Sequence, residues 1–373
     1  MDALATPSNW QRVRLGDIGK PCMCKRVMKH QTTRYGEIPF YKIGTFGNTA
    51  DAFISKKLFL EYKTKYSFPK KGDILISASG TIGRAVIYDG KPAYFQDSNI
   101  VWIDNDETLV KNDFLFYAYS NIKWNTEHTT ILRLYNDNFR NTLIPLPPLN
   151  EQIAIANILS TLDRYLYSLD ALILKKESVK KALSFELLSQ RKRLKGFNQN
   201  WQRVRLGDIA NYLTSNLSAE QITQQGKIKV YDVNNFIGYT NTTFISDKPY
   251  ISIVKDGSVG RVRILPPKTN ILSTMGALIA NHKTTTEFLF YLLSNFDFKN
   301  FTSGSIIPHI YFKDYKEKTI FLPPLNEQIA IANILSDLDS EITSLKNKKR
   351  QFENIKKALN HDLMSAKIRV LKN

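Results

Sequence analysis

Two short glycine-containing segments have the residue types and spacing of a loop that contacts phosphate. Glycine permits positive φ and close approach to the backbone, so such a loop can direct main-chain N–H groups, a hydroxyl and a guanidinium at a phosphate. The same spacing is also typical of a β-turn between two strands, and both interpretations can hold together. The residues concerned are Gly80, Thr81, Gly83 and Arg84 in the first segment and Gly257, Ser258, Gly260 and Arg261 in the second.

Two further groups of polar and aromatic residues, one ahead of each glycine segment, are candidates for contacts with base edges. In the major groove a side-chain amide suits adenine, and a cationic side chain suits guanine. Half or more of protein–DNA hydrogen bonds go to the DNA backbone, so the prediction concerns the regions more than single residues. The candidates are Tyr41, Lys42 and Thr45 in the first region and Tyr231, Asn234 and Asn235 in the second.

Familiar catalytic motifs are missing from the sequence. It has no P-loop, no His-Glu-x-x-His metal motif and no nucleophile elbow. Its proline pairs are followed by Leu or Lys, so it also lacks the proline-aromatic pocket of an amino-methyltransferase. Cys22 and Cys24 are too few for a disulfide framework, or for a structural zinc site without histidine ligands. We therefore expect a noncatalytic chain that holds no metal or cofactor of its own.

The composition indicates a polyanionic partner. The 373 residues include 52 Lys and Arg and 34 Asp and Glu. The net charge of +18 favours nucleic acid as the first candidate partner and an acidic membrane as the second. The basic excess is spread along the chain, which favours a long positive surface over a basic arm. The sequence has neither a signal-peptide core nor 18 uncharged apolar residues in a row, so we expect a soluble cytoplasmic protein.

The chain contains an internal repeat. Residues 9 to 18 return unchanged at 200 to 209, and residues 147 to 160 return unchanged at 323 to 336, whereas the segment between them differs in length and sequence. One architecture that presents two recognition surfaces would have this pattern. The repeat predicts recognition domains at residues 1–146 and 197–322, and helical spacer segments at 147–196 and 323–373.

A long helix is predicted after each repeated proline pair. Asn150 is a suitable N-cap, and Glu151 suits the positive end of the helix. Apolar residues then recur at alternating steps of four and three, which is coiled-coil spacing, over about 45 residues. This seam consists of Ile155, Leu159, Leu162, Leu166, Leu169, Ile173, Leu183 and Leu187 in the first helix, and of Ile331, Leu335, Leu338, Ile342, Leu345, Phe352, Leu359 and Leu363 in the second.

The two apolar stripes are expected to cover each other, because a solitary helix would expose its stripe to water. The first helix leads from the first body to the second and the other helix begins at the second body, so the simplest pairing is antiparallel. This would place the two bodies at opposite ends of a rod with pseudo-two-fold symmetry. The alternative is that each helix packs only on its own domain.

The divergent segments indicate mixed α and β structure. Short β-rich runs at residues 73–77, 85–88, 227–231 and 251–254 are bounded by turn residues. A helix is predicted in each segment around residues 112–117 and 286–291, where the same Phe-Leu-Phe-Tyr run occurs. The predicted fold class is α+β, with two mixed α/β recognition domains joined by two long antiparallel coiled-coil helices.

The order of these motifs resembles that of the DNA specificity subunits of type I restriction-modification systems. The resemblance lies in the opening from Trp10 to Asp17, the Lys-Gly-Asp run at 71–77 with the glycine segment after it, and the Pro-Pro-Leu-Asn-Glu-Gln helix start. Most of these motifs occur twice, so the resemblance covers essentially the whole chain. One departure is that residues 249–254 lack the Gly-Asp turn of residues 71–76.

This resemblance implies two target recognition domains that each bind one half of a bipartite DNA site, separated by a helical spacer. It also implies partner subunits: two methyltransferase subunits that use S-adenosylmethionine on adenine, and translocating restriction subunits that use ATP and Mg²⁺. By this resemblance, the glycines and arginines of the two glycine segments correspond to loop positions in the family's recognition domains. The helix starts carry over as spacer and partner-binding positions, namely Asn150, Glu151 and Gln152, with Asn326, Glu327 and Gln328.

Two other functional classes remain open from the residues alone. The first is a coiled-coil interaction scaffold whose basic bodies bind nucleic acid without sequence preference. The second is an autonomous nuclease, which the missing catalytic motifs disfavour.

Overall fold

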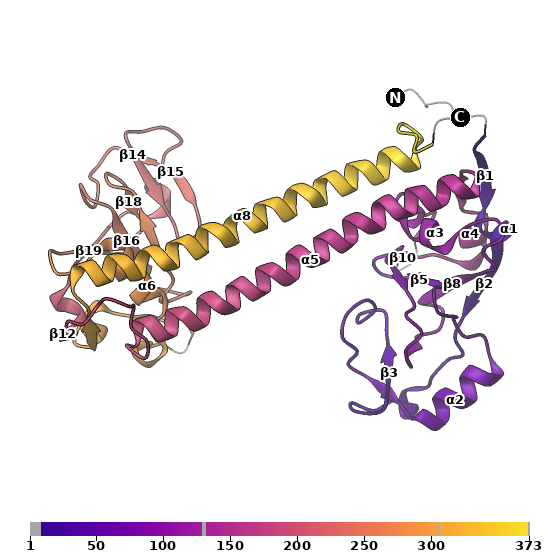
Figure 1. The fold of residues 1–373 in the computed structure, drawn as a ribbon, viewed down its shortest axis with the longest axis horizontal. Coiled ribbons are helices and arrows are strands. Elements are labelled where there is room, and N and C mark those ends of the chain that lie inside the picture. The colour runs from indigo at the N-terminus through magenta and orange to yellow at the C-terminus, as the bar shows by residue number, and fades with distance from the viewer. Residues whose placement is uncertain (1–8, 129–131, 305, 372–373) are drawn as a thin grey trace. The chain divides into compact units, whose positions relative to one another are not determined.

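The computed structural model describes residues 9–128, 132–304 and 306–371. The chain forms two compact units: unit 1 is Met1–Leu169 with Lys348–Asn373, and unit 2 is Asp170–Asn347. Helix α5 (Leu149–Leu188) begins in unit 1 and ends in unit 2, whereas helix α8 (Leu325–Met364) does the reverse. Each unit therefore contains one of the divergent segments and about half of each long helix (Figure 1).

The described residues of unit 1 form three small sheets, a separate pair of short strands and four short α-helices. The strand orders are β2-β8-β5-β6, β4-β3-β7 and β1-β11, and all neighbours are antiparallel except β3 and β7. Strands β9 and β10 form a separate hairpin. The elements are β1 (Gln11–Arg14), α1 (Leu15–Ile18), β2 (Gly19–Met23), β3 (Ile38–Tyr41), β4 (Phe53–Ile54), α2 (Lys56–Lys65), β5 (Ile74–Ser77), β6 (Ala85–Ile87), β7 (Tyr94–Phe95), β8 (Ile100–Asn105), α3 (Asn112–Tyr119), β9 (Glu127–His128), β10 (Leu132–Arg133), α4 (Asn136–Asn141) and β11 (Leu143–Leu146).

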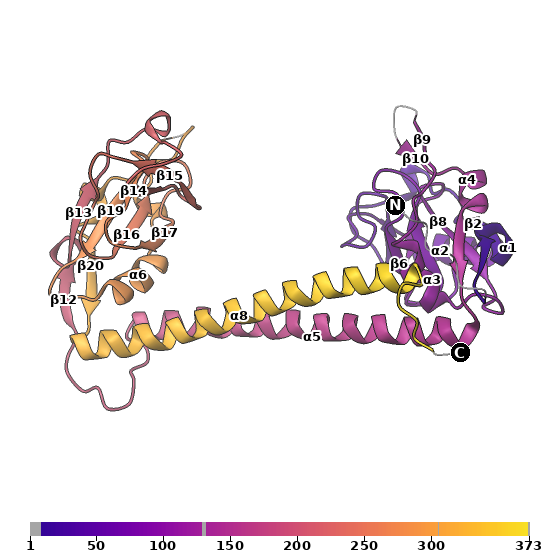
Figure 2. The ribbon, with the colours of Figure 1, turned by 90° about the horizontal axis from the view of Figure 1, so that it is seen from above.

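Unit 2 repeats the same three sheets. Their orders are β13-β19-β16-β17, β15-β14-β18 and β12-β20, with β14 and β18 as the parallel pair. Helix α6 packs on β16 and β17, as α3 packs on β5 and β6 (Figure 2). The elements are β12 (Gln202–Arg205), β13 (Ala210–Thr214), β14 (Ile228–Tyr231), β15 (Phe236–Thr240), β16 (Tyr250–Val254), β17 (Val262–Leu265), β18 (Asn270–Ile271), β19 (Met275–Ala280), α6 (Thr286–Ser294), α7 (Phe312–Tyr315) and β20 (Thr319–Leu322).

The predicted strands and helices of the divergent segments are confirmed. The four β-rich runs correspond to β5, β6, β14 and β16, and the two Phe-Leu-Phe-Tyr runs lie in α3 and α6. The internal repeat is therefore a repeat of topology as well as of sequence, and the α+β class is confirmed.

The core of each unit includes the ends of both long helices. In unit 1, Phe114 and Leu115 of α3 are buried together with Ile155 and Leu159 of α5 and Leu363 of α8. A fully buried leucine or phenylalanine contributes roughly 1.5–3 kcal/mol, so this shared core fixes the helix ends on the domain. The counterparts in unit 2 are Phe288, Leu289, Ile331, Leu335 and Leu187.

Within each unit the two helices run antiparallel, as predicted. Residue numbers rise along one helix as they fall along its neighbour, and every seam residue is buried or half-buried. The cross-helix pairs are Asp163 with Lys356 and Tyr165 with Phe352 in unit 1, and Lys176 with Glu341 and Lys180 with Asp339 in unit 2.

The helices are somewhat shorter than the predicted length of about 45 residues. Each has 40 residues. Soon after each helix ends, an equivalent residue has a positive φ, 62° at Gln190 and 55° at Ala366, and this left-handed conformation cannot continue a helix. No helix among the described residues is long and apolar enough to span a bilayer.

Candidate nucleic-acid interface

Each glycine segment is a tight turn between neighbouring strands of the four-stranded sheet. The first joins β5 to β6 and the second joins β16 to β17. All four glycines have positive φ, from 65° at Gly80 to 83° at Gly83. The β-turn interpretation is therefore confirmed, and contact with phosphate stays a prediction.

The two glycines of each turn have different surroundings. A Cβ on Gly83 would lie 2.1 Å from Nε1 of Trp124, and a Cβ on Gly260 would lie 2.6 Å from the ring of Phe298. By contrast, Gly257 has open space around it, and Gly80 is also exposed. The second glycine of each turn is thus required for packing under an aromatic ring, whereas the first is accessible to a ligand.

In unit 1 the structure brings the predicted base-contacting region to the glycine turn. Arg84 donates from Nη1 to the carbonyl oxygen of Phe46 at 2.9 Å, across to the turn that follows β3. The Lys42 backbone N–H donates to Oγ1 of Thr45 at 3.1 Å, which shapes that turn. Tyr41 stacks on Phe95, while Lys42 pairs with Asp51 at 2.8 Å. Tyr41, Lys42 and Thr45 therefore lie on the segment that Arg84 contacts.

Unit 2 has an equivalent arrangement with different residues. The backbone N–H groups of Asn234 and Asn235 both donate to Oδ1 of Asp232, at 2.7 and 2.6 Å, and both asparagines are exposed. Arg263 lies with its guanidinium carbon 5.2 Å from the ring centroid of Tyr231 and donates to the carbonyl oxygen of Asn234 at 3.0 Å.

Arg263 is a site residue that the sequence analysis missed. It lines one hollow of about 220 Å³ together with Asn234 and Arg261. The available sequence indication was its position two residues after Arg261, because alternate residues of a strand lie on the same face. Ser258 and Arg261 are exposed at this turn, as Thr81 and Arg84 are in unit 1.

A third element beside each glycine turn was also missed. In unit 1, Arg133 of the β9–β10 hairpin bridges to Ser79, and in unit 2 His309 bridges to Asp256. His309 also places Nδ1 at 2.6 Å from Oδ1 of Asp256. These segments differ at nearly all positions between the copies and have no clear periodicity, so their position could not be predicted from the sequence.

The turn before β16 differs from its counterpart before β5, as the sequence indicated. In unit 1, Gly72 has a φ of 95°, and the buried Asp73 accepts a hydrogen bond from the Lys70 backbone N–H at 2.7 Å. Burial raises the pKa of Asp73. Unit 2 lacks this turn, yet β16 pairs with both β17 and β19, so the strand itself does not depend on it.

At each helix start a buried glutamate links three parts of its unit. Glu151 accepts hydrogen bonds from Nε1 of Trp10 at 3.1 Å and from Arg369 at 2.8 and 3.0 Å. In unit 2, Glu327 accepts from Trp201 at 3.0 Å and from Arg193 at 3.1 and 2.6 Å. The carboxylates are 2% and 1% exposed, so they are available to no external partner.

The neighbouring glutamines also point inward. The side-chain oxygen of Gln152 accepts from the Lys111 backbone N–H at 2.9 Å, and that of Gln328 accepts from the Thr285 N–H at 3.1 Å. Asn150 and its counterpart Asn326 are exposed and accept from the following backbone N–H at 2.9 Å. Partner binding at these six positions stays a prediction, and only the two asparagines offer exposed side chains for it.

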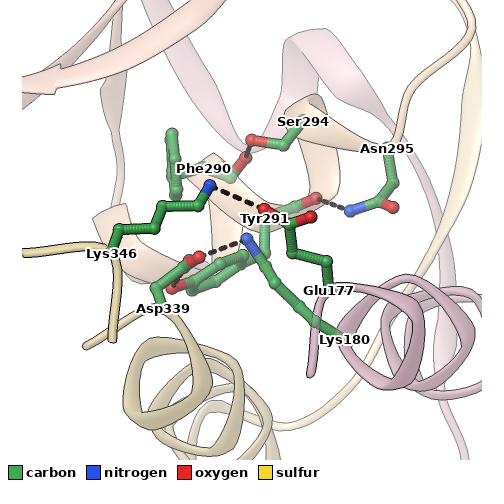
Figure 3. Close-up of polar contacts among 8 residues, drawn as sticks. All are labelled: Glu177, Lys180, Phe290, Tyr291, Ser294, Asn295, Asp339 and Lys346. Atoms are coloured by element: carbon green, nitrogen blue, oxygen red, sulfur yellow. Dashed lines mark hydrogen bonds and ion pairs between the residues drawn. The ribbon is translucent and has the colours of Figure 1, made fainter. Parts of the chain in front are cut away.

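A Tyr-Asp-Lys cluster attaches one short helix of each unit, α3 in unit 1 and α6 in unit 2, to both long helices. In unit 2, the Tyr291 hydroxyl donates to Asp339 at 2.9 Å, and Lys180 pairs with the same carboxylate at 2.5 Å (Figure 3). Burial, together with the adjacent Asp339 carboxylate, raises the pKa of Tyr291. Unit 1 repeats the cluster with Tyr117, Asp163 and Lys356.

Comparisons of the sequence with known proteins all indicate the same family. The family model for the type I restriction modification DNA specificity domain matches residues 7–176 and 198–354. The chain is 30% identical over 404 residues to the putative type I restriction enzyme MjaX specificity subunit of Methanocaldococcus jannaschii, covering 98% of this chain and 95% of that protein. It is 64% identical to a putative specificity subunit of Haemophilus influenzae, but over 148 residues that cover 39% of this chain and 38% of that protein.

Solved structures show the same fold. The S subunit of a type I restriction-modification system from M. genitalium has a TM-score of 0.64 at 20% identity, covering 97% of both chains. A chain from a study of complex assembly and conformational transition of the type I R-M system has a TM-score of 0.57 at 15% identity, covering 97% of this chain and 99% of that one. With two matched specificity domains, one in each repeat, the chain belongs to the family of DNA specificity subunits of type I restriction-modification systems.

Proposed function

We propose that this chain is the noncatalytic, sequence-specific DNA-binding subunit of a type I restriction-modification complex, and that each unit binds one half of a bipartite target. The observation that carries the proposal is the repeated scaffold with different side chains at equivalent places. Tyr41 and Tyr231 end the equivalent strands β3 and β14 and are identical. Lys42 and Thr45 lie beside one glycine turn, whereas Asn234 and Asn235 lie beside the other. Two equivalent scaffolds with different polar residues suit two different half-sites.

The division of roles within each interface follows from the surroundings of the residues. Exposed Arg84 and Arg261, with the accessible first glycine of each turn, suit sequence-independent contact with phosphate. The exposed amides of Asn234 and Asn235 suit the adenine edge in the major groove. The net charge of +18 would add attraction to DNA that depends strongly on salt.

The proposal includes partner subunits that supply the chemistry. Two methyltransferase subunits would bind the helical spacer and methylate adenine with S-adenosylmethionine, and restriction subunits would use ATP and Mg²⁺. Support comes from the two helix starts, which are identical in sequence and repeat the same internal contacts around Glu151 and Glu327. These contacts are buried, but they hold the exposed Asn150 and Asn326 at equivalent places, and two equivalent surfaces suit two copies of the same partner.

The proposal is tested by purifying the chain with its methyltransferase partner and mapping methylation on random-sequence DNA. We expect methylation at one interrupted two-part sequence, and retention of that site against competitor DNA at physiological salt. If no two-part sequence emerges and binding falls uniformly as salt rises, the chain is a nonspecific scaffold instead. Cleavage of DNA by the chain alone with Mg²⁺ would indicate a nuclease.

The matched variants Arg84→Ala and Arg261→Ala test the phosphate role of the glycine turns. Each should weaken binding to all sequences alike and lower the slope of log affinity against log salt by about 1, because one phosphate contact is lost. The methylated sequence should stay the same. A changed target sequence would instead assign the arginine to a base.

A further inference from the structure

The structure points to a second DNA-contacting element in unit 2. Resting on the proposed function, we propose that the isoleucine turn, defined as residues 303–304 and 306–309, contacts the half-site of unit 2, with Ile306 against the 5-methyl group of a thymine. This turn lies beside the glycine turn, and the sequence analysis assigned it no role.

The turn presents two apolar side chains to solvent. Ile306 is 92% exposed and Ile307 is 55% exposed. Ile307 precedes Pro308 and His309, whose backbone groups hold the turn in place. Single exposed apolar residues are ordinary, but two adjacent isoleucines on an anchored turn form a small apolar projection.

The base of the turn is fixed by several hydrogen bonds. Ser303 and His309 exchange backbone hydrogen bonds at 2.9 and 2.7 Å, and the Gly257 backbone N–H donates to the Pro308 carbonyl oxygen at 2.9 Å. Gly304 has a φ of 89°, and a Cβ there would lie 2.3 Å from the Ile307 carbonyl oxygen, so glycine is required at this position. The two ends of the turn, at Ser303 and at Pro308 and His309, are therefore held in place before any ligand binds, which lowers the entropy cost of binding.

The charge beside the turn suits DNA. The chain continues from His309 into Ile310, whose backbone N–H donates to the Lys255 carbonyl oxygen at 2.9 Å. Ile310 lines a hollow of about 380 Å³ together with Lys255, Lys313 and Lys316, and no acidic side chain is among the described residues that line it. Two carboxylates also lie near the turn: Glu317 is 3.9 Å from Nζ of Lys316, and Asp256 pairs with His309 at 2.6 Å. The positive charge that suits phosphates flanking a base edge therefore comes mainly from Lys255 and Lys313.

The kind of base follows from the side chain. Ile306 can neither donate nor accept a hydrogen bond, and the 5-methyl group of thymine is the apolar feature of the base edges in the major groove. An aliphatic side chain there would prefer an A·T pair by contact with that methyl group.

The same position differs in the other unit. The hairpin that bridges to Ser79 has Glu127 and His128 on one strand and Leu132 and Arg133 on the other. The scaffold is thus shared. Counted back from the bridging residues Arg133 and His309, the sequence has Thr130 where unit 2 has Ile306, whereas Ile131 and Ile307 are identical. This is what two units that bind different half-sites require, and it makes the effect of Ile306 specific to one half of the target.

The test uses the complex with its methyltransferase partner and the mapped target. Binding is measured on DNA in which deoxyuridine, which lacks the 5-methyl group, replaces each thymine in turn. For the native chain, we expect one replacement in the half-site of unit 2 to weaken binding about fourfold, the factor for one buried methyl group. For Ile306→Ala we expect the same replacement to have no effect.

Leu60→Ala, which alters an aliphatic residue that is 51% exposed on α2, is the control and should behave as the native chain. The inference is overturned if Ile306→Ala keeps the full sensitivity to deoxyuridine, or if the half-site of unit 2 contains no sensitive thymine. In either case a bipartite target can still be present, so the proposed function stands. Loss of any two-part target in the native complex would instead refute the proposed function.

Discussion

Arg193→Ala should loosen unit 2 and leave unit 1 unchanged. The guanidinium forms a two-point pair with Glu327 at 3.1 and 2.6 Å, and the carboxylate is 1% exposed. Removing one partner of a buried ion pair costs roughly 3–5 kcal/mol, because the remaining charge is left buried. The Trp201 N–H still donates to this carboxylate, and Arg193 is 26% exposed, so we expect about 3 kcal/mol, at the lower end of that range.

Hydrogen exchange detects this loss of stability at the affected segments, whereas a single melting curve would combine the unfolding of the two units. About 3 kcal/mol corresponds to roughly a hundredfold faster opening of the start of α8 and of β12. Because residues 323–336 repeat residues 147–160, the peptides must extend into flanking residues that differ between the copies. The segment at 147–160 then serves as an internal control of identical sequence.

The repeat also provides a reciprocal variant. Arg369 makes the equivalent pair with Glu151 in unit 1, so Arg369→Ala should expose the start of α5 and spare the start of α8, which lies in unit 2. Adding Glu327→Gln to Arg193→Ala should recover part of the loss, since no charge is then left buried. Equal exchange changes in both units from either single variant, or no change from both, would mean that the two ion pairs do not stabilise their own units.

Three further predictions concern the turns, the Tyr-Asp-Lys cluster and the helix seam. Gly257→Ala should cost about 1 kcal/mol of unfolding free energy from backbone strain alone, and Gly260→Ala should cost more because its Cβ would also clash with Phe298. Urea unfolding of the two variants measures this difference. Tyr291→Phe should cost about 1.5–3 kcal/mol because its hydrogen bond to a carboxylate is lost, and an unchanged unfolding midpoint would contradict that role. Leu162→Asp combined with Leu338→Asp should lower the unfolding free energy by about 3 kcal/mol and weaken partner binding, because carboxylates enter the half-buried seam. Unaltered thermal melting and unaltered partner binding would mean that the seam is misassigned.

The parts of the fold that follow a period or a repeat could be predicted from the sequence. The spacing of the seam residues predicted α5 and α8, and the Phe-Leu-Phe-Tyr runs predicted α3 and α6. The helix length was overestimated because the left-handed conformation at Gln190 and Ala366 has no glycine to mark it.

The candidate site was only partly predictable. The glycine spacing located both turns, yet it could not separate Gly83, which lies under Trp124, from the exposed Gly80. The isoleucine turn and Arg263 reach the site through long-range contacts that one sequence does not specify. Glu151 and Gln152 were assigned to a spacer surface, but their side chains bind distant parts of their own unit.

The most direct test of the account is a domain exchange. Residues 200–322 are replaced by the equivalent segment of another family member with a known target, and the methylated sequence of the complex is mapped. If each unit binds its half-site independently, one half of the bipartite target should change to that of the donor while the other half stays the same. A change in both halves, or in neither, would contradict the claim that each unit binds one half-site independently.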